Sequence, residues 1–132
     1  MTASTYNPHV SANSDTPAVD DLIGSWIGLI GQKFTMANAT VIDRGTVVGL
    51  NGSSEALKSL SAAGDGSQTP FGICAQTTTA TDTEVLVFVH GSFNAREVER
   101  HLGTAHTIAS IREGLRAKGI YLEWPVRRYP DV

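Results

Sequence analysis

The segment 81–102, TDTEVLVFVHGSFNAREVERHL, decides the expected fold together with the segment 108–122, IASIREGLRAKGIYL. In the first segment, large apolar side chains occupy both alternating sets of positions from Glu84 to Phe93. That pattern predicts a central strand covered on both faces. Asn94 follows as a helix N-cap, and Glu97 three residues later approximates a capping box. We therefore expect a buried strand that runs directly into a helix.

Two short helices and a final strand are expected after this central strand. Gly103 ends the first helix, and either Thr104 or Thr107 caps the second. Gly119 suits the left-handed residue that follows a helix end, and 120–122 begins another strand. The second helix carries apolar residues at helical spacing: Ile108, Ile111 and Leu115.

The chain before this segment is rich in β-forming residues and turns. We expect strands at 40–42 and 46–48, a turn at 51–52, a helical turn at 55–60, a loop at 61–70, a strand at 71–76 and a polar turn at 77–83. The fold class is therefore mainly β with one or two short helices, an α+β fold.

The apolar run 22–31, LIGSWIGLIG, contains three glycines, each of which costs about 1 kcal/mol relative to Ala inside a helix. We therefore expect an extended segment lying on an apolar surface. That surface belongs either to its own domain or to a neighbouring subunit that meets Trp26 and Ile27. The run is too short to cross a membrane, which takes about 20 apolar residues.

Residues 1–21 differ from the rest of the chain because they are polar and include two prolines. Such a segment cannot bury enough apolar surface to offset the entropy of ordering it, so it needs a partner to become ordered. We expect an extended arm at 1–21 and a single β-rich domain at 22–132. No basic region followed by a hydrophobic core opens the sequence, so we expect no secretory signal peptide.

Composition and the polar residues provide no catalytic site. Charged residues are 17% of the chain against about a quarter in typical domains, and a net charge of −3 does not favour nucleic-acid binding. Cys74 is the single cysteine, which excludes an intrachain disulfide, and its apolar neighbours predict an inert buried thiol. His101 and His106 lie on opposite sides of a helix break, so they do not form a zinc motif. We expect no catalytic residue, no metal and no cofactor.

A set of short motifs resembles the head decoration proteins of tailed, lambda-like bacteriophages, which are capsid cement proteins. The motifs occur in order from about Leu22 to Leu122: 44–49 (RGTVVG), 65–68 (DGSQ) with Pro70, 91–94 (GSFN), 115–116 (LR) and 119–122 (GIYL). The chain departs from the family in its longer LIGSWIGLIG segment and in a basic and aromatic tail at 124–132.

The resemblance implies a β-clip-like fold and homotrimers on the local three-fold positions of an expanded capsid. It also implies that the arm adds a strand to a major capsid protein of the HK97-like fold, and we place that contact at Thr5, Tyr6, Asn7, Pro8, His9 and Val10. Contacts between subunits are expected at Trp26, Ile27, Tyr121 and Trp124.

The protein is then expected on the outer surface of the virion, and in the host cytoplasm during assembly. Two alternatives remain: a small trimeric β enzyme such as a nucleotide hydrolase, or another head or tail accessory protein. The absence of a clustered Asp, Ser and Arg phosphate site disfavours the enzyme.

Overall fold

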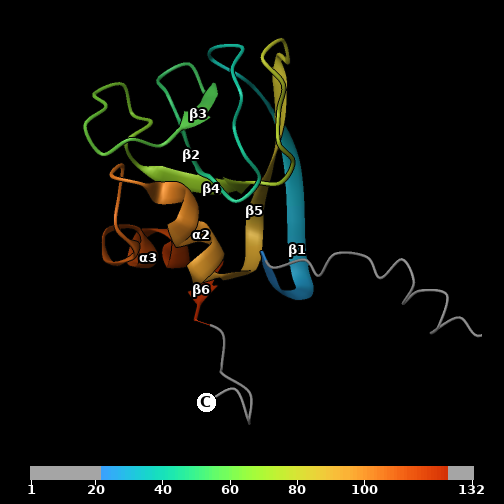
Figure 1. The fold of residues 1–132 in the computed structure, drawn as a ribbon, viewed down its shortest axis with the longest axis vertical. Helices are drawn as coiled ribbons and strands as arrows, with labels where there is room; N and C mark the ends of the chain where they lie inside the picture. The colour runs from blue at the N-terminus through green and yellow to red at the C-terminus, as the bar shows by residue number, and fades with distance from the viewer. Residues whose placement is uncertain (1–21, 125–132) are drawn as a thin grey trace, which may run out of the picture.

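The computed structural model describes residues 22–124, apart from the side chain of Trp26. It is a mainly β fold with two short helices, as predicted (Figure 1). The elements are β1 (Ile23–Thr35), β2 (Val47–Leu50), β3 (Ala56–Lys58), β4 (Pro70–Cys74), β5 (Glu84–Asn94), α2 (Ala95–Leu102), α3 (Ile108–Ala117) and β6 (Ile120–Glu123). The run 22–31 is extended, as expected, and forms most of β1.

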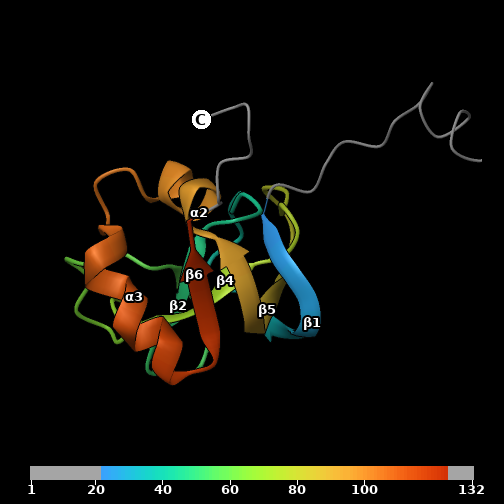
Figure 2. The same cartoon turned by 90° about the horizontal axis from the view of Figure 1, so that it is seen from below.

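The central strand of the sheet is β5. The strand order is β1-β5-β4-β2-β3, and β6 also pairs with β5. The first half of β5 pairs antiparallel with β4, where Phe88 lies opposite Ile73, and its second half pairs parallel with β6, where Gly91 lies opposite Ile120. β1 pairs antiparallel with β5 on the other side (Figure 2). The prediction of a central strand is therefore confirmed.

The sheet curls until the chain after β1 meets β3. Met36 bridges to Ala56, and the Ala37 N–H donates to the Ala56 carbonyl at 3.0 Å. One face of the curled sheet buries a cluster drawn from its own strands and loops: Met36, Ile42, Val48, Ala56, Cys74, Val85 and Val87. The other face packs on the two helices through a second cluster that includes Val47, Ile73, Phe88, Phe93, Val98, Leu102, Ile111, Leu115, Ile120 and Leu122. Both faces of β5 are therefore covered, as predicted.

The start of α2 confirms the predicted cap but not the predicted capping box. The Asn94 side chain accepts a hydrogen bond from the Arg96 N–H at 2.9 Å. The Asn94 N–H, which a capping box would pair with Glu97, donates instead to the Leu22 carbonyl at 2.8 Å. The Glu97 carboxylate binds Arg100. A contact between the helix start and Leu22, the residue before β1, thus replaces the local one.

The remaining helix ends follow the sequence closely. Gly103 ends α2 at a φ of 57°. Thr107, rather than Thr104, caps α3 and forms a capping box with Ser110. Gly119 follows α3 at a φ of 88°, and its N–H donates to the Arg116 carbonyl at 3.0 Å. Gly103 and Gly119 take a backbone conformation that side chains disfavour, which explains why both helices stop there.

Two predicted elements are wrong. Residues 40–42 are not a strand, because Ile42 forms hydrogen bonds with Thr78 in the loop 77–83. The Ile42 N–H donates to Thr78 Oγ1 at 2.8 Å, and the Ile42 carbonyl accepts the Thr78 N–H. The expected helical turn at 55–60 is the strand β3, which pairs with β2 through Leu50 opposite Ala56. The strand predicted at 71–76 is shifted to Pro70–Cys74.

The turn after β2 is present but has a different form from the two-residue turn that Asn51 and Gly52 suggest. The loop runs through residues 51–55, and Asn51 Oδ1 accepts the N–H groups of Ser53 and Glu55, both at 2.9 Å. The positive φ, 62°, falls on Ser54. The asparagine organises this hairpin through its side chain, as in an Asx turn.

Candidate interaction surface

One serine and one histidine have the spacing of a nucleophile and its base, but their surroundings are structural. Ser59 Oγ lies 3.0 Å from His106 Nε2 and donates to the Gln68 carbonyl at 3.2 Å. A hydroxyl has one proton, so Ser59 accepts from His106 and cannot be deprotonated by it. Ser59 is also only 1% exposed, and burial lowers the pKa of His106. The pair ties two loops together.

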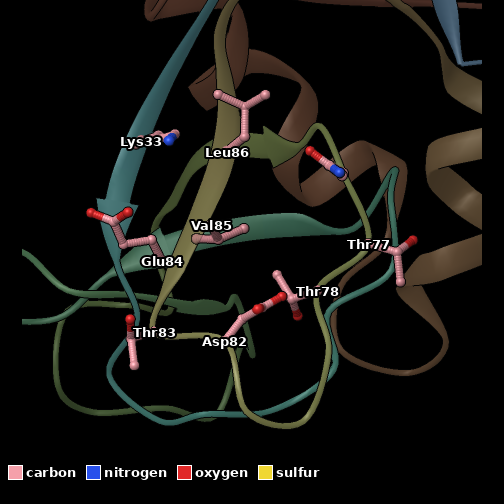
Figure 3. Close-up of a pocket in the computed structure, with 9 residues that line it drawn as sticks. Lys33, Thr77, Thr78, Asp82, Thr83, Glu84, Val85 and Leu86 are labelled. Atoms are coloured by element: carbon pink, nitrogen blue, oxygen red, sulfur yellow. The ribbon is translucent and has the colours of Figure 1, made fainter.

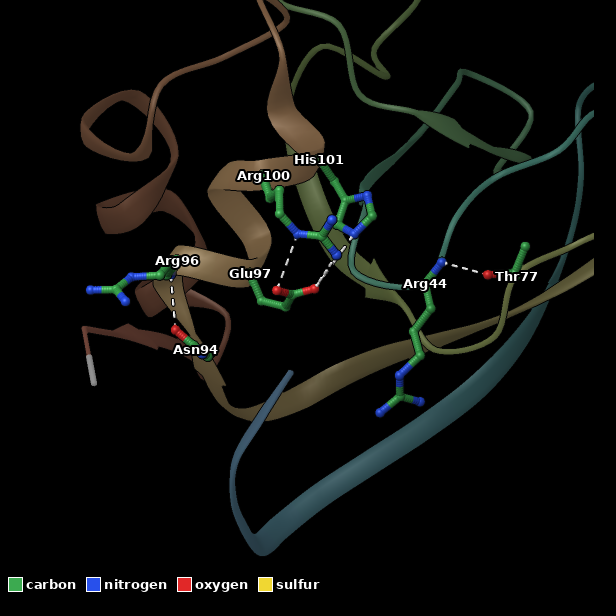
Figure 4. A network of polar contacts seen from close by, with 7 residues as sticks. All are labelled: Arg44, Thr77, Asn94, Arg96, Glu97, Arg100 and His101. Carbon is green, nitrogen blue, oxygen red and sulfur yellow. Dashed lines mark hydrogen bonds and ion pairs between the residues drawn. The ribbon is translucent and has the colours of Figure 1, made fainter. Parts of the chain in front are cut away.

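The charged residues of α2 form local contacts (Figure 4). Arg100 Nη2 lies 2.6 Å from Glu97 Oε2, and this hydrogen bond lowers the pKa of Glu97. His101 Nε2 lies 3.9 Å from the same carboxylate. The His101 ring packs over Gly45, where a Cβ would come within 3.0 Å of it and where φ is 97°. Among residues 22–124, no group of three His, Cys, Asp or Glu side chains could hold a metal ion.

A hollow of about 280 Å³ lies between the start of β5 and the loop 77–83 (Figure 3). Several of its polar groups are used to hold that loop in place. Thr77 Oγ1 accepts the Arg44 N–H at 3.0 Å, and Asp82 Oδ2 accepts the Thr79 N–H at 2.8 Å. Lys33 and Glu84 stand at its rim. No nucleophile and base meet here, so the hollow is a junction between loops.

Cys74 is fully buried, as predicted from its neighbours. Burial raises the pKa of its thiol to about 11. The neutral thiol therefore predominates at physiological pH, and it acts as a small apolar side chain in the core.

The residues of the motifs at 44–49 and 65–68 have structural roles in packing and hydrogen bonding. A Cβ at Gly49 would overlap the carbonyl of Ser67, which is fully buried against β2. Asp65 Oδ1 accepts the Ser67 N–H at 3.0 Å and the Ser67 hydroxyl at 2.6 Å, and these bonds lower the pKa of Asp65. Arg44 Nη1 donates to the Ala75 carbonyl at 2.8 Å. These residues hold loops against the sheet.

One exposed surface lies where β1, β5 and β6 run side by side. In the register of these strands, Ser25 lies opposite Ser92, and Ser92 lies opposite Tyr121. Four large apolar side chains are exposed on the two outer strands and at the end of β6. This apolar rim consists of Ile27 (88% exposed), Ile30 (49%), Tyr121 (42%) and Trp124 (44%).

The segment 26–29 of β1 forms a bulge, here called the β1 bulge. Between the pairs Ser25–Ser92 and Ile30–His90, the chain advances five residues in β1 but only two in β5. The three extra residues push the segment out of the ladder, as β-bulges do. His90 Nδ1 donates to the Gly28 carbonyl at 2.6 Å and so holds the bulge on β5.

The structure brings several predicted contact residues together. Ile27, Tyr121 and Trp124 are exposed at the same end of the sheet. Trp26 belongs to β1, but its side chain is outside the described part of the structure, as are the arm residues Thr5, Tyr6, Asn7, Pro8, His9 and Val10. Sequence reasoning missed Ile30, although it lies in the same apolar run.

A known protein family matches most of the chain. Residues 30–120 match the family of the bacteriophage lambda head decoration protein D. The chain belongs to this family. The resemblance found in the sequence is therefore confirmed, and the role of the protein is decoration of a phage capsid. No curated protein matches the chain.

Head decoration proteins are structural proteins of the phage head rather than enzymes, and the family places this chain on the capsid of the virion. Within residues 22–124, no helix is long and apolar enough to span a membrane. The matched range begins at Ile30 and ends at Ile120, so the β1 bulge and Trp124 lie outside it.

Proposed function

We propose that the protein cements the phage head: it binds the expanded capsid as a homotrimer at local three-fold positions and makes the shell more resistant to heat and internal pressure. Membership of the head decoration family is the observation that carries this proposal. A protein that binds only the assembled shell stabilises it by mass action. It acts on the outer surface of the virion, after synthesis in the host cytoplasm, without nucleic acid or cofactor.

The arm, residues 1–21, is the proposed contact with the major capsid protein, through a strand centred on 5–10. Pairing of main-chain groups gives affinity to a segment that has little apolar surface. Three arms on one trimer combine modest contacts into tight binding. The chain enters the domain at Leu22, which is 3% exposed and whose carbonyl accepts the Asn94 N–H. A pull on the arm is therefore transmitted to a fixed point of the core.

The apolar rim supports the proposed homotrimer. Large exposed apolar side chains gathered in one area mark contact surfaces. Ile27, Tyr121 and Trp124 are such side chains, and Trp26 is next to Ile27 in the same strand. We place the contacts between subunits at these four residues.

Titration into purified shells tests the proposal. The full chain should saturate expanded shells and raise their melting temperature, while unexpanded shells bind it much more weakly. A variant without residues 1–20 should keep the melting temperature of the free protein and lose binding to the shell. Equal binding to both shell forms, or saturation without a gain in shell stability, would show that the protein is not a cement.

A further inference from the structure

The loop between β2 and β3 contains the pair Asn51–Gly52, and among the asparagines of the chain Asn51 alone precedes a glycine. In such a pair, the backbone nitrogen of the glycine can attack the side-chain amide of the asparagine, because the glycine has no side chain to shield it. Gly52 is exposed, and a Cβ added there would meet nothing within 4 Å. Its N–H forms no hydrogen bond within the described part of the chain. The nitrogen is therefore accessible and unengaged.

The side-chain amide of Asn51 is held by hydrogen bonds at both of its polar atoms. Its Oδ1 accepts the N–H groups of Ser53 and Glu55, both at 2.9 Å. Its Nδ2 donates to Glu55 Oε1 at 3.1 Å. A backbone N–H only donates and a carboxylate only accepts, so this orientation of the amide satisfies all of these partners. The loop thus fixes the amide that the neighbouring nitrogen would attack.

The two N–H donors also affect the reactivity of the Asn51 amide. Hydrogen bonds to Oδ1 draw electron density away from Cγ and make that carbon a better electrophile. The same donors are in place to stabilise the negative charge that develops on Oδ1 when a nitrogen adds to Cγ, as in an oxyanion hole. One exposed loop therefore combines a free nucleophile with a polarised carbonyl.

We propose that Asn51 and Gly52 form a self-modification site, which converts Asn51 to aspartate or isoaspartate in the folded protein. The Gly52 nitrogen loses its proton to hydroxide and forms a bond to Asn51 Cγ. The Cγ–Nδ2 bond breaks, and ammonia leaves after taking a proton from water, so a succinimide ring remains. Water then opens the ring. Attack at Cγ breaks its new bond to nitrogen and gives aspartate, whereas attack at the main-chain carbonyl breaks the original peptide bond and gives isoaspartate.

Both products disturb the hairpin formed by β2 and β3. In the aspartate product, an oxygen takes the place of Nδ2, which lies 3.1 Å from Glu55 Oε1. A hydrogen bond thereby becomes a contact between two carboxylates, which repel each other. In the isoaspartate product, the main chain passes through the former side chain and is longer by a methylene. That change alters the spacing between Leu50 and Ala56, which pair across the loop.

Ala56 links this hairpin to the place where the curled sheet closes. It is 1% exposed, it bridges to Met36, and its carbonyl accepts the Ala37 N–H at 3.0 Å. A change in the loop just before Ala56 therefore acts on a buried junction of the fold. We expect the modified chain to be less stable than the intact one.

Peptide mapping of the full chain tests the site. The wild type and Gly52→Ala are incubated at alkaline pH, digested under acidic conditions and followed by mass spectrometry, with an isoaspartate-specific methyltransferase to identify that product. We expect aspartate and isoaspartate to accumulate at position 51 faster than at Asn38 or Asn94, and faster as the pH rises. Gly52→Ala should keep the stability of the wild type, because its Cβ has space, but should slow the conversion strongly because the methyl group shields the nitrogen. Equal conversion of the two proteins would overturn the proposed attack by the Gly52 nitrogen.

A synthetic peptide of residues 47–58 separates the effect of the folded loop from that of the Asn-Gly pair. The peptide contains the same pair but lacks the fixed hydrogen bonds of the loop. The folded chain should be converted at least as fast as the peptide. Slower conversion in the folded chain, or an intact Asn51, would overturn the proposal, because the loop would then protect the amide.

Variants that imitate the product test its effect on the hairpin. We expect Asn51→Asp to raise the equilibrium constant of unfolding about tenfold, which is about 1.4 kcal/mol. Adding Glu55→Gln places an amide donor opposite the new carboxylate and should restore most of the stability, and Glu55→Gln alone is the control. Asn51→Asp with the stability of the wild type, or no recovery in the double variant, would overturn the proposed repulsion at Glu55.

Discussion

Replacing Leu115 with alanine tests how α3 packs on the sheet. Leu115 is fully buried in the cluster that joins the helices to the sheet. The change removes three carbon atoms, worth about 2.4 kcal/mol at about 0.8 kcal/mol each, and the cavity adds to this loss. We expect the free energy of unfolding to fall by about 3–4 kcal/mol and the melting temperature by roughly 10–15 °C.

Gly114→Ala is the matched control one residue away. Gly114 lies inside α3, and a Cβ there would meet nothing within 4 Å. Alanine should therefore raise stability by about 0.5–1 kcal/mol, because it restricts the unfolded chain. Both variants are measured by denaturant unfolding at one protein concentration, since association adds to apparent stability. A loss below about 1 kcal/mol for Leu115→Ala would refute the burial of this face of α3.

Three further predictions concern backbone fit, pH and thiol reactivity. Gly49→Ala should destabilise the fold by about 3 kcal/mol or more, because its Cβ overlaps the Ser67 carbonyl, whereas Gly52→Ala, with open space around it, should change the unfolding midpoint little. Folding lowers the pKa of His106, so the unfolded state binds more protons than the folded state, and the free energy of unfolding should fall as the pH drops below about 6.5. Denaturant titrations from pH 8 to pH 5 should show a smaller fall for His106→Gln than for the wild type. Cys74, buried with a pKa of about 11, should react with a thiol reagent at pH 8 only after unfolding, and fast reaction in the native protein would contradict its burial.

Local signals allowed the helices to be predicted from the sequence. Asn94 and Thr107 cap their helices with their own side chains, and Gly103 and Gly119 end them. Each of these interactions joins residues within one or two turns of each other, so the sequence contains all of its participants. The apolar pattern of β5 was equally clear, since burial on both faces leaves no polar alternation.

The elements that were predicted wrongly depend on hydrogen bonds with distant parts of the chain. Residues 40–42 are as β-prone as many strands, yet Ile42 bonds with Thr78 in a loop 36 residues away. Residues 56–58 could form a helical turn by themselves, but pairing with β2 makes them β3. The N–H of Asn94 was expected to bind Glu97 but donates to the carbonyl of Leu22, the residue before β1. In each case a hydrogen bond to a residue far away in the sequence forms in place of the local one.

The candidate interaction surface was likewise predicted only in part from the sequence. The sequence alone determined the family, through its ordered motifs, and it led us to predict Ile27 and Tyr121 as contact residues. Only the tertiary structure places these two residues on opposite edges of β5, and only it joins His90 to the Gly28 carbonyl 62 residues away. Strand register and bulges depend on how separate segments meet, and that information is not contained in any one segment.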